Sequence, residues 1–359
     1  MHDICSPVIS MTTDTDLPDA AESEAAAHAQ RHALYRVQTR IAHDADEQAR
    51  NLHGWRQTYD QLTSGRFIGQ LTGLHVDDMH VFRETTSETL RQTCEVQSDA
   101  YWLGIPVNRG ATGRIDGGLI DGETVALRAG GIEFELVTPA GYEIFGVVVQ
   151  GGILRRHAAL AGHGDALIDR ASLSRVLRID PARKTQLCAR LAHILAEGDA
   201  ALATCARPQL HASVLDALLD ACATTTDGEP IEAPSSRSRR RRIVGESRDY
   251  VLANRDRPVS VPELCEHLHV SRRTLQYCFE DVLGMAPASY LRVIRLNGAR
   301  RELCDASRGG ALSVQNVAAA WGFWHLSQFA TDYRKLFGMR PSDTLKAAQM
   351  LHSELRFAH

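Results

Sequence analysis

The chain has 359 residues, enough for two ordinary domains, and 44% of them are hydrophobic, as in a globular protein. No apolar run approaches the ~20 residues of a membrane helix, and the polar, acidic N-terminus lacks the pattern of a secretory signal. Eight cysteines without a Cys-x-x-Cys pair suit neither a disulfide framework nor a zinc site. We therefore expect a cytoplasmic protein with reduced thiols and no membrane partner.

The net charge of −4 is distributed unevenly along the chain. Residues 237–359 carry 20 Lys and Arg against 12 Asp and Glu, a net charge of +8, which leaves −12 for residues 1–236. A basic C-terminal third on an acidic body is typical of a nucleic-acid-binding domain attached to another domain.

The first 223 residues predict an N-terminal domain of mixed structure. Residues 1–45 are rich in Ala, Asp, Glu and His, which predicts a disordered or loosely helical start. Short apolar runs between Gly-rich turns follow from Phe67 to Val149 and indicate an antiparallel barrel or sandwich. We expect residues 46–223 to be a cupin-like β-barrel sensor with helices. Apolar stripes at residues 187–195 and 214–219 would cover the barrel, pair with a second subunit to form a homodimer, or both.

Residues 224–242 contain Thr, Gly, Pro, Ser and a run of four arginines, which predicts an interdomain linker. Residues 243–345 should then form an all-α domain, and residues 346–359 a tail. The chain as a whole is expected to be α+β.

Two helix-turn-helix units are expected in the basic region. Ser260 can cap the first helix, and Glu263 completes a capping box. Ser271 is a good cap for the next helix, and Gly284 stops it. Apolar residues at i, i+3, i+4 and i+7 give each of these helices one buried face.

A linker helix is predicted from Ala288 to Cys304, and Ser313 would cap the second unit. In that unit Gly322 allows a sharp turn, and Gly338 and Pro341 end the last helix. Its buried residues should be Leu326, Phe329, Tyr333 and Phe337. Two reading helices separated in this way could enter adjacent major-groove faces of one duplex, about 34 Å apart.

The open faces of these helices supply candidates for contacts with double-stranded DNA. Basic, amide and aromatic side chains near the helix starts are candidates for base contacts: Arg272, Arg273, Gln276, Trp324, His325 and Gln328. Basic side chains farther along are candidates for phosphate contacts: Arg292, Arg295, Arg334 and Lys335.

The second unit resembles the AraC/XylS family of bacterial transcription regulators. The residues that carry this resemblance are Ala318, Gly322-Phe323, Ser327, Phe329, Tyr333, Arg334, Gly338 and Pro341. The chain departs from the family at Arg340, where Ser or Thr is usual, and at Trp324-His325, where a small polar cap is common. The resemblance implies a DNA-binding regulator without enzymatic activity, and RNA polymerase as a partner if the chain is an activator.

Within that family, segments such as residues 55–62, 128–136 and 321–326 are similar to activators of ethanolamine-utilisation operons. This likeness implies an effector-controlled activator of a catabolic operon, with ethanolamine and adenosylcobalamin as candidate signals. The alternative within the family is a response to a different small alcohol, amine or acid.

An ammonium ligand would favour aromatic faces and a carboxylate. Five residues of the expected strands offer these groups: Phe82, Glu84, Tyr101, Trp102 and Tyr142. Each also fits an ordinary barrel core or rim.

The rival hypothesis from another class is a small-molecule-binding or cupin-like enzyme domain with accessory helices. His75 and His80 have the wrong spacing for a cupin metal site, so we predict neither a metal site nor catalytic residues.

Overall fold

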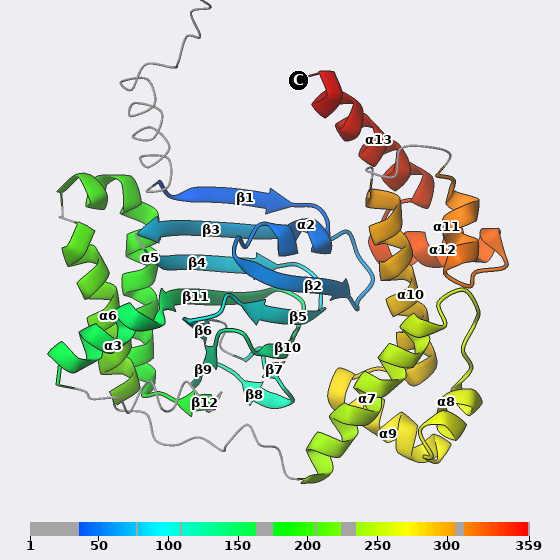
Figure 1. Cartoon of the computed structure of the whole chain (residues 1–359), viewed down its shortest axis with the longest axis horizontal. Helices are drawn as coiled ribbons and strands as arrows, with labels where there is room; N and C mark the ends of the chain where they lie inside the picture. The colour runs from blue at the N-terminus through cyan, green and yellow to red at the C-terminus, as the bar shows by residue number, and fades with distance from the viewer. Residues whose placement is uncertain are drawn as a thin grey trace, which may run out of the picture.

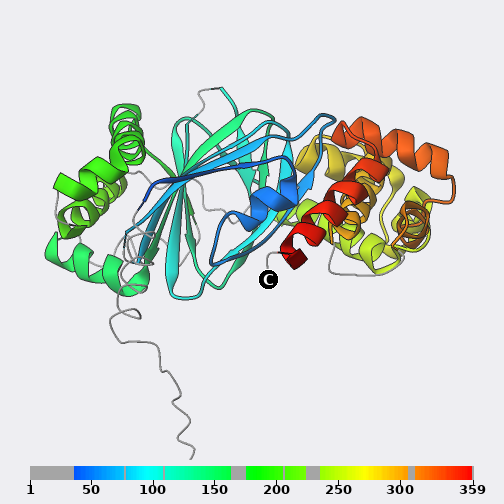
Figure 2. The same ribbon diagram turned by 90° about the horizontal axis from the view of Figure 1, so that it is seen from above.

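The computed structural model describes residues 36–76, 78–107, 110–162, 175–204, 207–223, 235–305 and 312–357. These residues form an N-terminal domain of two sheets and several helices, followed by an all-helical C-terminal domain (Figures 1 and 2). The α+β organisation is therefore confirmed. Among the described helices, none combines the length and hydropathy that crossing a membrane would require.

The strands form two antiparallel sheets. In order across the larger sheet, the strands are β1 (Gln38–Ala42), β3 (Gly69–Val76), β4 (Met79–Thr86), β11 (Tyr142–Gln150), β6 (Ala100–Pro106), β9 (Thr124–Ala129) and β12 (Arg175–Arg178). Across the smaller sheet they are β2 (Trp55–Gln61), β5 (Leu90–Val96), β10 (Glu133–Thr138), β7 (Gly113–Ile115) and β8 (Gly118–Ile120). Both sheets are open at their edges, so the strands make a sandwich and not the closed cupin-like barrel.

One apolar core lies between the two sheets. Tyr59 and Phe134 of the smaller sheet pack there with Phe82 and Trp102 of the larger one. The hydrogen-bonded strand order never returns from β12 to β1, so the barrel cannot close. The turn spacing in the sequence was equally compatible with a sandwich, and only strand pairing distinguishes the two architectures.

Helices α3 (Gly151–Leu160), α5 (Pro181–Thr204) and α6 (Arg207–Ala223) pack on the outer side of the larger sheet (Figure 2). Both predicted apolar stripes are buried there: Leu187, Leu191, Ile194 and Leu195 on α5, and Val214, Leu215, Leu218 and Leu219 on α6. The stripes thus cover their own domain and are not available to pair with a second subunit.

The start of the N-terminal domain differs from the expected disordered or loosely helical segment. Residues 1–35 lie outside the described part, but residues 38–42 form strand β1, which pairs along its length with β3. The β-branched Thr39 and Ile41 favour this extended edge position. Asp44 then caps helix α2 (Ala45–Arg50) by accepting hydrogen bonds from the backbone N–H groups of Asp46 and Glu47.

The C-terminal domain contains α7 (Ser235–Ala253), α8 (Val261–His267), α9 (Arg272–Leu283), α10 (Pro287–Cys304), α11 (Val314–Ala320), α12 (Leu326–Phe337) and α13 (Pro341–Phe357). Two boundaries differ from expectation. Helix α7 begins inside the predicted linker 224–242, since Arg240 pairs with Asp281 and Arg241 with Asp116. Helix α13 runs through the predicted tail, because Thr344 and Ala348 are buried against the domain.

Most of the expected helix ends are confirmed. Ser260 and Glu263 form a complete capping box, and Ser271 and Ser313 each accept a hydrogen bond from the third residue of the helix that follows. Gly284 and Gly338 end α9 and α12 in the left-handed conformation. One predicted core residue is wrong: Leu326 is 43% exposed, because it opens the first turn of α12, before the buried stripe begins.

Candidate nucleic-acid interface

The first reading helix, α9, presents its basic start to solvent. Arg272 and Arg273 are both exposed in its first turn, where the Ser271 cap fixes the local backbone. One turn farther on, the Gln276 side chain donates a 2.6 Å hydrogen bond to Glu280. The guanidinium groups of Arg272 and Arg273 are thus available to contact guanine edges, and Glu280 orients the amide of Gln276.

The second reading helix, α12, repeats this layout with different side chains. Trp324 is 69% exposed just before the helix, and His325 occupies the N-cap position without a side-chain capping bond. Gln328 donates a 2.9 Å hydrogen bond to Asp332, as Gln276 does to Glu280 in the first unit. The start of this helix is therefore less firmly fixed by its own sequence than that of α9.

Three of the four phosphate candidates lie where DNA could reach them. Arg334 and Lys335 are exposed in the last turn of α12, beside a surface cavity of about 630 Å³ that Arg340 also lines. Arg292 is exposed on α10, where it forms a 3.4 Å ion pair with Asp332. These charges can contribute to affinity for the backbone of a duplex.

Arg295 is the exception, and its prediction as a phosphate contact is wrong. Its side chain is only 9% exposed, and its Nε donates to the backbone oxygen of Leu291. The guanidinium also lies over the ring of Phe323 at 5.0 Å. Burial lowers the pKa of Arg295, and the charge of Arg292 lowers it further. Arg295 therefore fills space between α10 and the turn of the second unit.

The other arginines of α10 bind the N-terminal domain. Arg300 pairs with Asp44, and Arg301 contacts Asp60 at 2.8 Å and Asp46 at 3.3 Å. We name this set of five residues the arginine clamp. No local signal in the sequence pairs these arginines with carboxylates 241 to 256 positions away.

Backbone contacts extend the same interface to α12. Asn297 of α10 exchanges two hydrogen bonds with the backbone of Gln61, with N···O distances of 2.9 and 3.0 Å. The side chain of Gln61 and the backbone N–H of Gly65 both donate to the carbonyl oxygen of Leu336 near the end of α12. The end of β2 and the loop after it thereby touch the linker helix and the second reading helix together.

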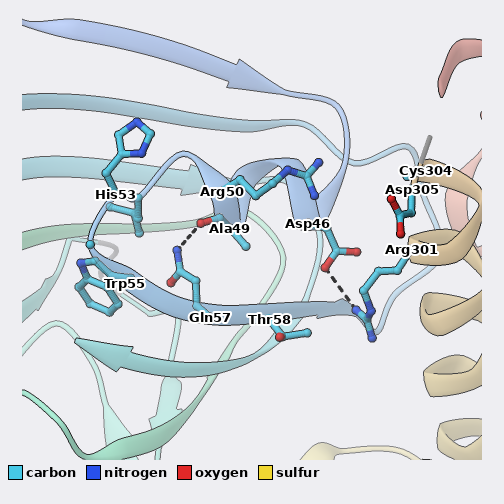
Figure 3. A pocket seen from close by; sticks show the side chains of 12 residues that line it. Asp46, Ala49, Arg50, His53, Trp55, Gln57, Thr58, Arg301, Cys304 and Asp305 are labelled. Atoms are coloured by element: carbon cyan, nitrogen blue, oxygen red, sulfur yellow. Dashed lines mark hydrogen bonds and ion pairs between the residues drawn. The ribbon is translucent and has the colours of Figure 1, made fainter. Parts of the chain in front are cut away.

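A cavity of about 820 Å³ lies beside the clamp, between α2, β2 and the end of α10 (Figure 3). Asp46 and Arg301 face each other across one end of it, and Trp55 and Gln57 line the other. Burial raises the pKa of Asp46 to about 7, although Arg301 opposes that shift. Burial also acts to raise the pKa of Asp44, but Arg300 and two backbone N–H groups bring it below its ordinary value.

The five effector candidates do not share one face of the sandwich. Phe82, Glu84, Trp102 and Tyr142 lie in the layer between the sheets, but Tyr101 packs on the outer side with the helices, so its assignment to the same pocket is wrong. Neighbours on a strand point to opposite faces, and Tyr101 and Trp102 are adjacent on β6. Strand alternation alone could have separated them.

Glu84 is the unusual member of this group. It is 4% exposed, and it accepts hydrogen bonds from Gln48 Nε2 at 2.9 Å and from the Tyr59 hydroxyl at 3.3 Å. Burial raises its pKa to about 7, and no cation among the described residues contributes to the shift. Gln48 could not be predicted as a partner of Glu84, because nothing in the local sequence shows that α2 directs this side chain into the sandwich.

Aromatic rings surround the same interior. Trp55 contacts Phe82, Trp102 and Phe134 edge to face, with centroid separations of 5.7 to 6.3 Å. The Nε1 of Trp102 and the Oε1 of Gln48 are buried without a hydrogen-bond partner. A carboxylate, aromatic rings and the unpartnered amide oxygen of Gln48 can hold an ammonium group, whereas Trp102 Nε1 is a donor and could bond only an oxygen of the same ligand.

The two capped helix pairs, joined by α10 and exposing their reading helices, define a tandem helix-turn-helix DNA-binding domain. A family model described as a helix-turn-helix domain matches residues 264–347. The chain is 36% identical over 98 residues to the "Probable thc operon regulatory protein" of Rhodococcus erythropolis and 37% identical over 97 residues to the "XylDLEGF operon transcriptional activator" of Pseudomonas putida. These matches cover 27% of this chain and 29% and 30% of the relatives.

The chain thus spans less than a third of the length of these curated relatives. It also matches the crystal structure of a probable AraC family transcriptional regulator from Rhodopseudomonas palustris CGA009. That match has 32% identity and a TM-score of 0.27, and it covers 30% of this chain and 97% of the other. Because the TM-score is low, the sequence matches carry the assignment. The C-terminal domain belongs to the AraC/XylS family of helix-turn-helix domains.

Proposed function

We propose that the whole chain is a sequence-specific transcriptional regulator, and more narrowly an effector-responsive activator of a catabolic operon. The observation that carries this proposal is the pair of reading helices α9 and α12, both exposed at their starts and both mounted on α10. Relatives matched over this region are named as operon regulators. The activator acts on double-stranded DNA and on RNA polymerase, in the cytoplasm.

Binding of the full chain to a random-sequence duplex at low salt tests this proposal. We expect an electrophoretic shift at micromolar protein that weakens steeply as salt is added, because counterions are released from the phosphates. Rounds of selection from the random pool should then yield one preferred sequence. The absence of any shift would favour the rival function, a small-molecule-binding or enzymatic sandwich with accessory helices.

The effector we propose is a small primary amine held between the sheets. Glu84 supplies a buried carboxyl group without a described cationic partner, and the rings of Trp55, Phe82 and Trp102 supply faces that attract a cation. Ethanolamine is the first compound to test, and other small alcohols, amines or acids are the alternatives. Adenosylcobalamin is a second candidate signal, carried only by the sequence likeness.

Calorimetric titration of the full chain with ethanolamine tests the effector. We expect saturable binding that Glu84→Gln removes, since the substitution keeps the shape of the side chain and deletes its charge. The matched control is Glu133→Gln, an exposed carboxylate on β10, which should bind as the unmodified chain does. Equal binding by the chain and by Glu84→Gln would place the amine elsewhere.

We also propose a homodimer. Its interface must use surface other than the stripes of α5 and α6, which are already buried. Sedimentation equilibrium at micromolar concentration should give twice the mass of one chain, and the mass of a single chain at all concentrations would refute the dimer.

A further inference from the structure

Helix α2 touches both regions that a regulator must connect. Gln48, on one side of this six-residue helix, donates to the buried Glu84 inside the sandwich. Asp46, on the same helix, and Asp44, which caps it, pair with Arg301 and Arg300 of α10. Strand β2 also reaches both regions, since Tyr59 donates to Glu84 and Asp60 pairs with Arg301, but α2 with its cap pairs with both arginines.

We propose that α2 is the coupling element of this protein: an amine that takes Glu84 displaces Gln48, shifts α2, and breaks the Asp44–Arg300 and Asp46–Arg301 pairs that hold the linker helix. The inference rests on the effector site proposed above. In this proposal Gln48 responds to occupancy of the site. Asp44 and Asp46 transmit the movement of α2 to Arg300 and Arg301 on the linker helix.

The first step follows from the crowding around Glu84. Its described polar partners are Gln48 and Tyr59, and Gln48 is fully buried against it. Both bonds end on Oε1 of Glu84, so an ammonium group that takes this oxygen competes directly with the amide nitrogen of Gln48, which lies 2.9 Å from it. The charge-assisted bond to the amine is stronger than the amide bond that it replaces.

The second step follows from the length of α2. Residues 45–50 make less than two turns, so a shift at Gln48 moves the whole helix together with its cap. Asp44 holds both the helix, through two backbone N–H groups, and Arg300. Displacement of α2 therefore pulls Asp44 and Asp46 away from the two arginines at once.

The third step gives the sign of the effect. The reading starts at Arg272 and Trp324 are exposed in the clamped state, so the clamp does not cover them. Instead, the Asp44–Arg300 and Asp46–Arg301 pairs, together with the contacts of Gln61 and Asn297, fasten α10 and α12 to the sandwich, so the second unit cannot adjust to the groove independently while those pairs hold. The clamped state is thus the weak DNA-binding state, and release strengthens binding.

A ligand-free experiment tests the coupling with hydrogen exchange of the full chain. Gln48→Ala should raise the exchange rates of the α10 amides 297–304 about 5-fold or more, a size typical of coupled sites, and leave α5 unchanged. In an Arg301→Gln background, where the pairs with Asp46 and Asp60 are already lost and the Arg300–Asp44 pair remains, the same substitution should add less than about 2-fold. Equal effects in both backgrounds, or exchange confined to α2 and β2, would overturn the inference.

A second experiment measures affinity for the selected DNA site with and without saturating ethanolamine. Asp46→Asn removes one clamp charge and keeps the shape. Its matched control, Glu47→Gln, makes the same charge change one residue away, where the carboxylate accepts a hydrogen bond from the backbone of His43 and pairs with no arginine in the described part of the chain. We expect Asp46→Asn to bind DNA more tightly without amine and to lose most of the amine response. Glu47→Gln should keep both properties of the unmodified chain.

The possible outcomes distinguish a failure of the α2 coupling from a failure of the proposed effector. If ethanolamine does not bind the unmodified chain, the proposed effector fails, and the exchange experiment alone decides the coupling. If the amine binds and changes DNA affinity equally in Asp46→Asn and Glu47→Gln, the effector stands and the α2 coupling is wrong. If Asp46→Asn fails to fold, Arg301→Gln, whose side chain is partly exposed, replaces it in the same comparison.

Discussion

The arginines of the C-terminal domain fall into two groups that lie in different surroundings. Arg272, Arg273 and Arg334 stand at the ends of the reading helices and are exposed. Arg295 and Arg300 are less than 10% exposed and have partners inside the protein. The amino-acid composition does not distinguish the two groups, because both consist of arginines and both add to the positive charge of the domain.

The comparison shows that net charge overstates the surface offered to DNA. A buried guanidinium that already pairs with a carboxylate, such as Arg300 with Asp44, contributes to domain contact and not to counterion release. The exposed arginines keep their hydration in the folded protein and remain available to contact phosphate or guanine. Substitutions that change either stability or DNA binding, and leave the other unchanged, can therefore test the division between buried and exposed arginines.

The largest effect is expected from Arg300→Met. The substitution leaves Asp44 buried without its counter-charge, which costs about 3–5 kcal/mol when one partner of a buried pair is removed. Urea unfolding should show a large fall in midpoint. Arg272→Met, on the exposed side, should change stability by no more than about 0.5 kcal/mol. Similar losses for both variants would remove the distinction between the two groups.

Arg273→Ala should act on sequence preference instead of stability. Loss of a bidentate contact with guanine costs about 1–3 kcal/mol of discrimination. Competition between the selected site and its single-base variants measures this, and one position should become tolerant of substitution. A variant that discriminates as well as the unmodified chain would rule out base reading by Arg273.

The buried carboxyl groups should make the inner region sensitive to pH. Burial raises the pKa of Glu84 from 4.5 to about 7, so the folded chain binds more protons than the unfolded chain between these values. The free energy of unfolding should therefore rise as pH falls from 8 to 6, by about 1 kcal/mol for this group. Glu84→Gln should reduce that gain. An unchanged pH profile would mean that Glu84 titrates normally.

The smallest effect is expected from Arg334→Ala. It should weaken binding to all sequences alike and reduce the slope of log affinity against log salt by about 1, as for one lost phosphate contact. Arg295→Met is the control from the buried group, and its salt slope should stay unchanged. If both variants flatten the slope equally, the buried placement of Arg295 does not persist on DNA.

The sequence predicted local features of this domain well because local chemistry determines them. Ser260, Ser271 and Ser313 cap helices through neighbours three residues away, and Gly284 and Gly338 end helices by their own conformation. The sequence did not predict the arginine clamp, because Arg300 and Asp44 come into contact only when the two domains pack together.

The same distinction applies in the N-terminal domain. Turn spacing predicted the antiparallel strands, but barrel closure depends on which edge strands pair, and β1 was missed because its short polar sequence is extended only through pairing with β3. At the proposed effector site, the residue type of Glu84 suggested an ammonium ligand. Its isolation from cations and its bond to Gln48 depend on how α2 packs.

The central claim is that one chain reads DNA with two helices mounted on α10. Hydroxyl-radical and methylation footprinting of the full chain on its selected site tests this most directly. We predict two protected major-groove segments about one helical turn, or ~34 Å, apart on one face of the duplex. Arg273→Ala should weaken protection of one segment only. A single protected segment that no substitution in α12 alters would contradict the claim.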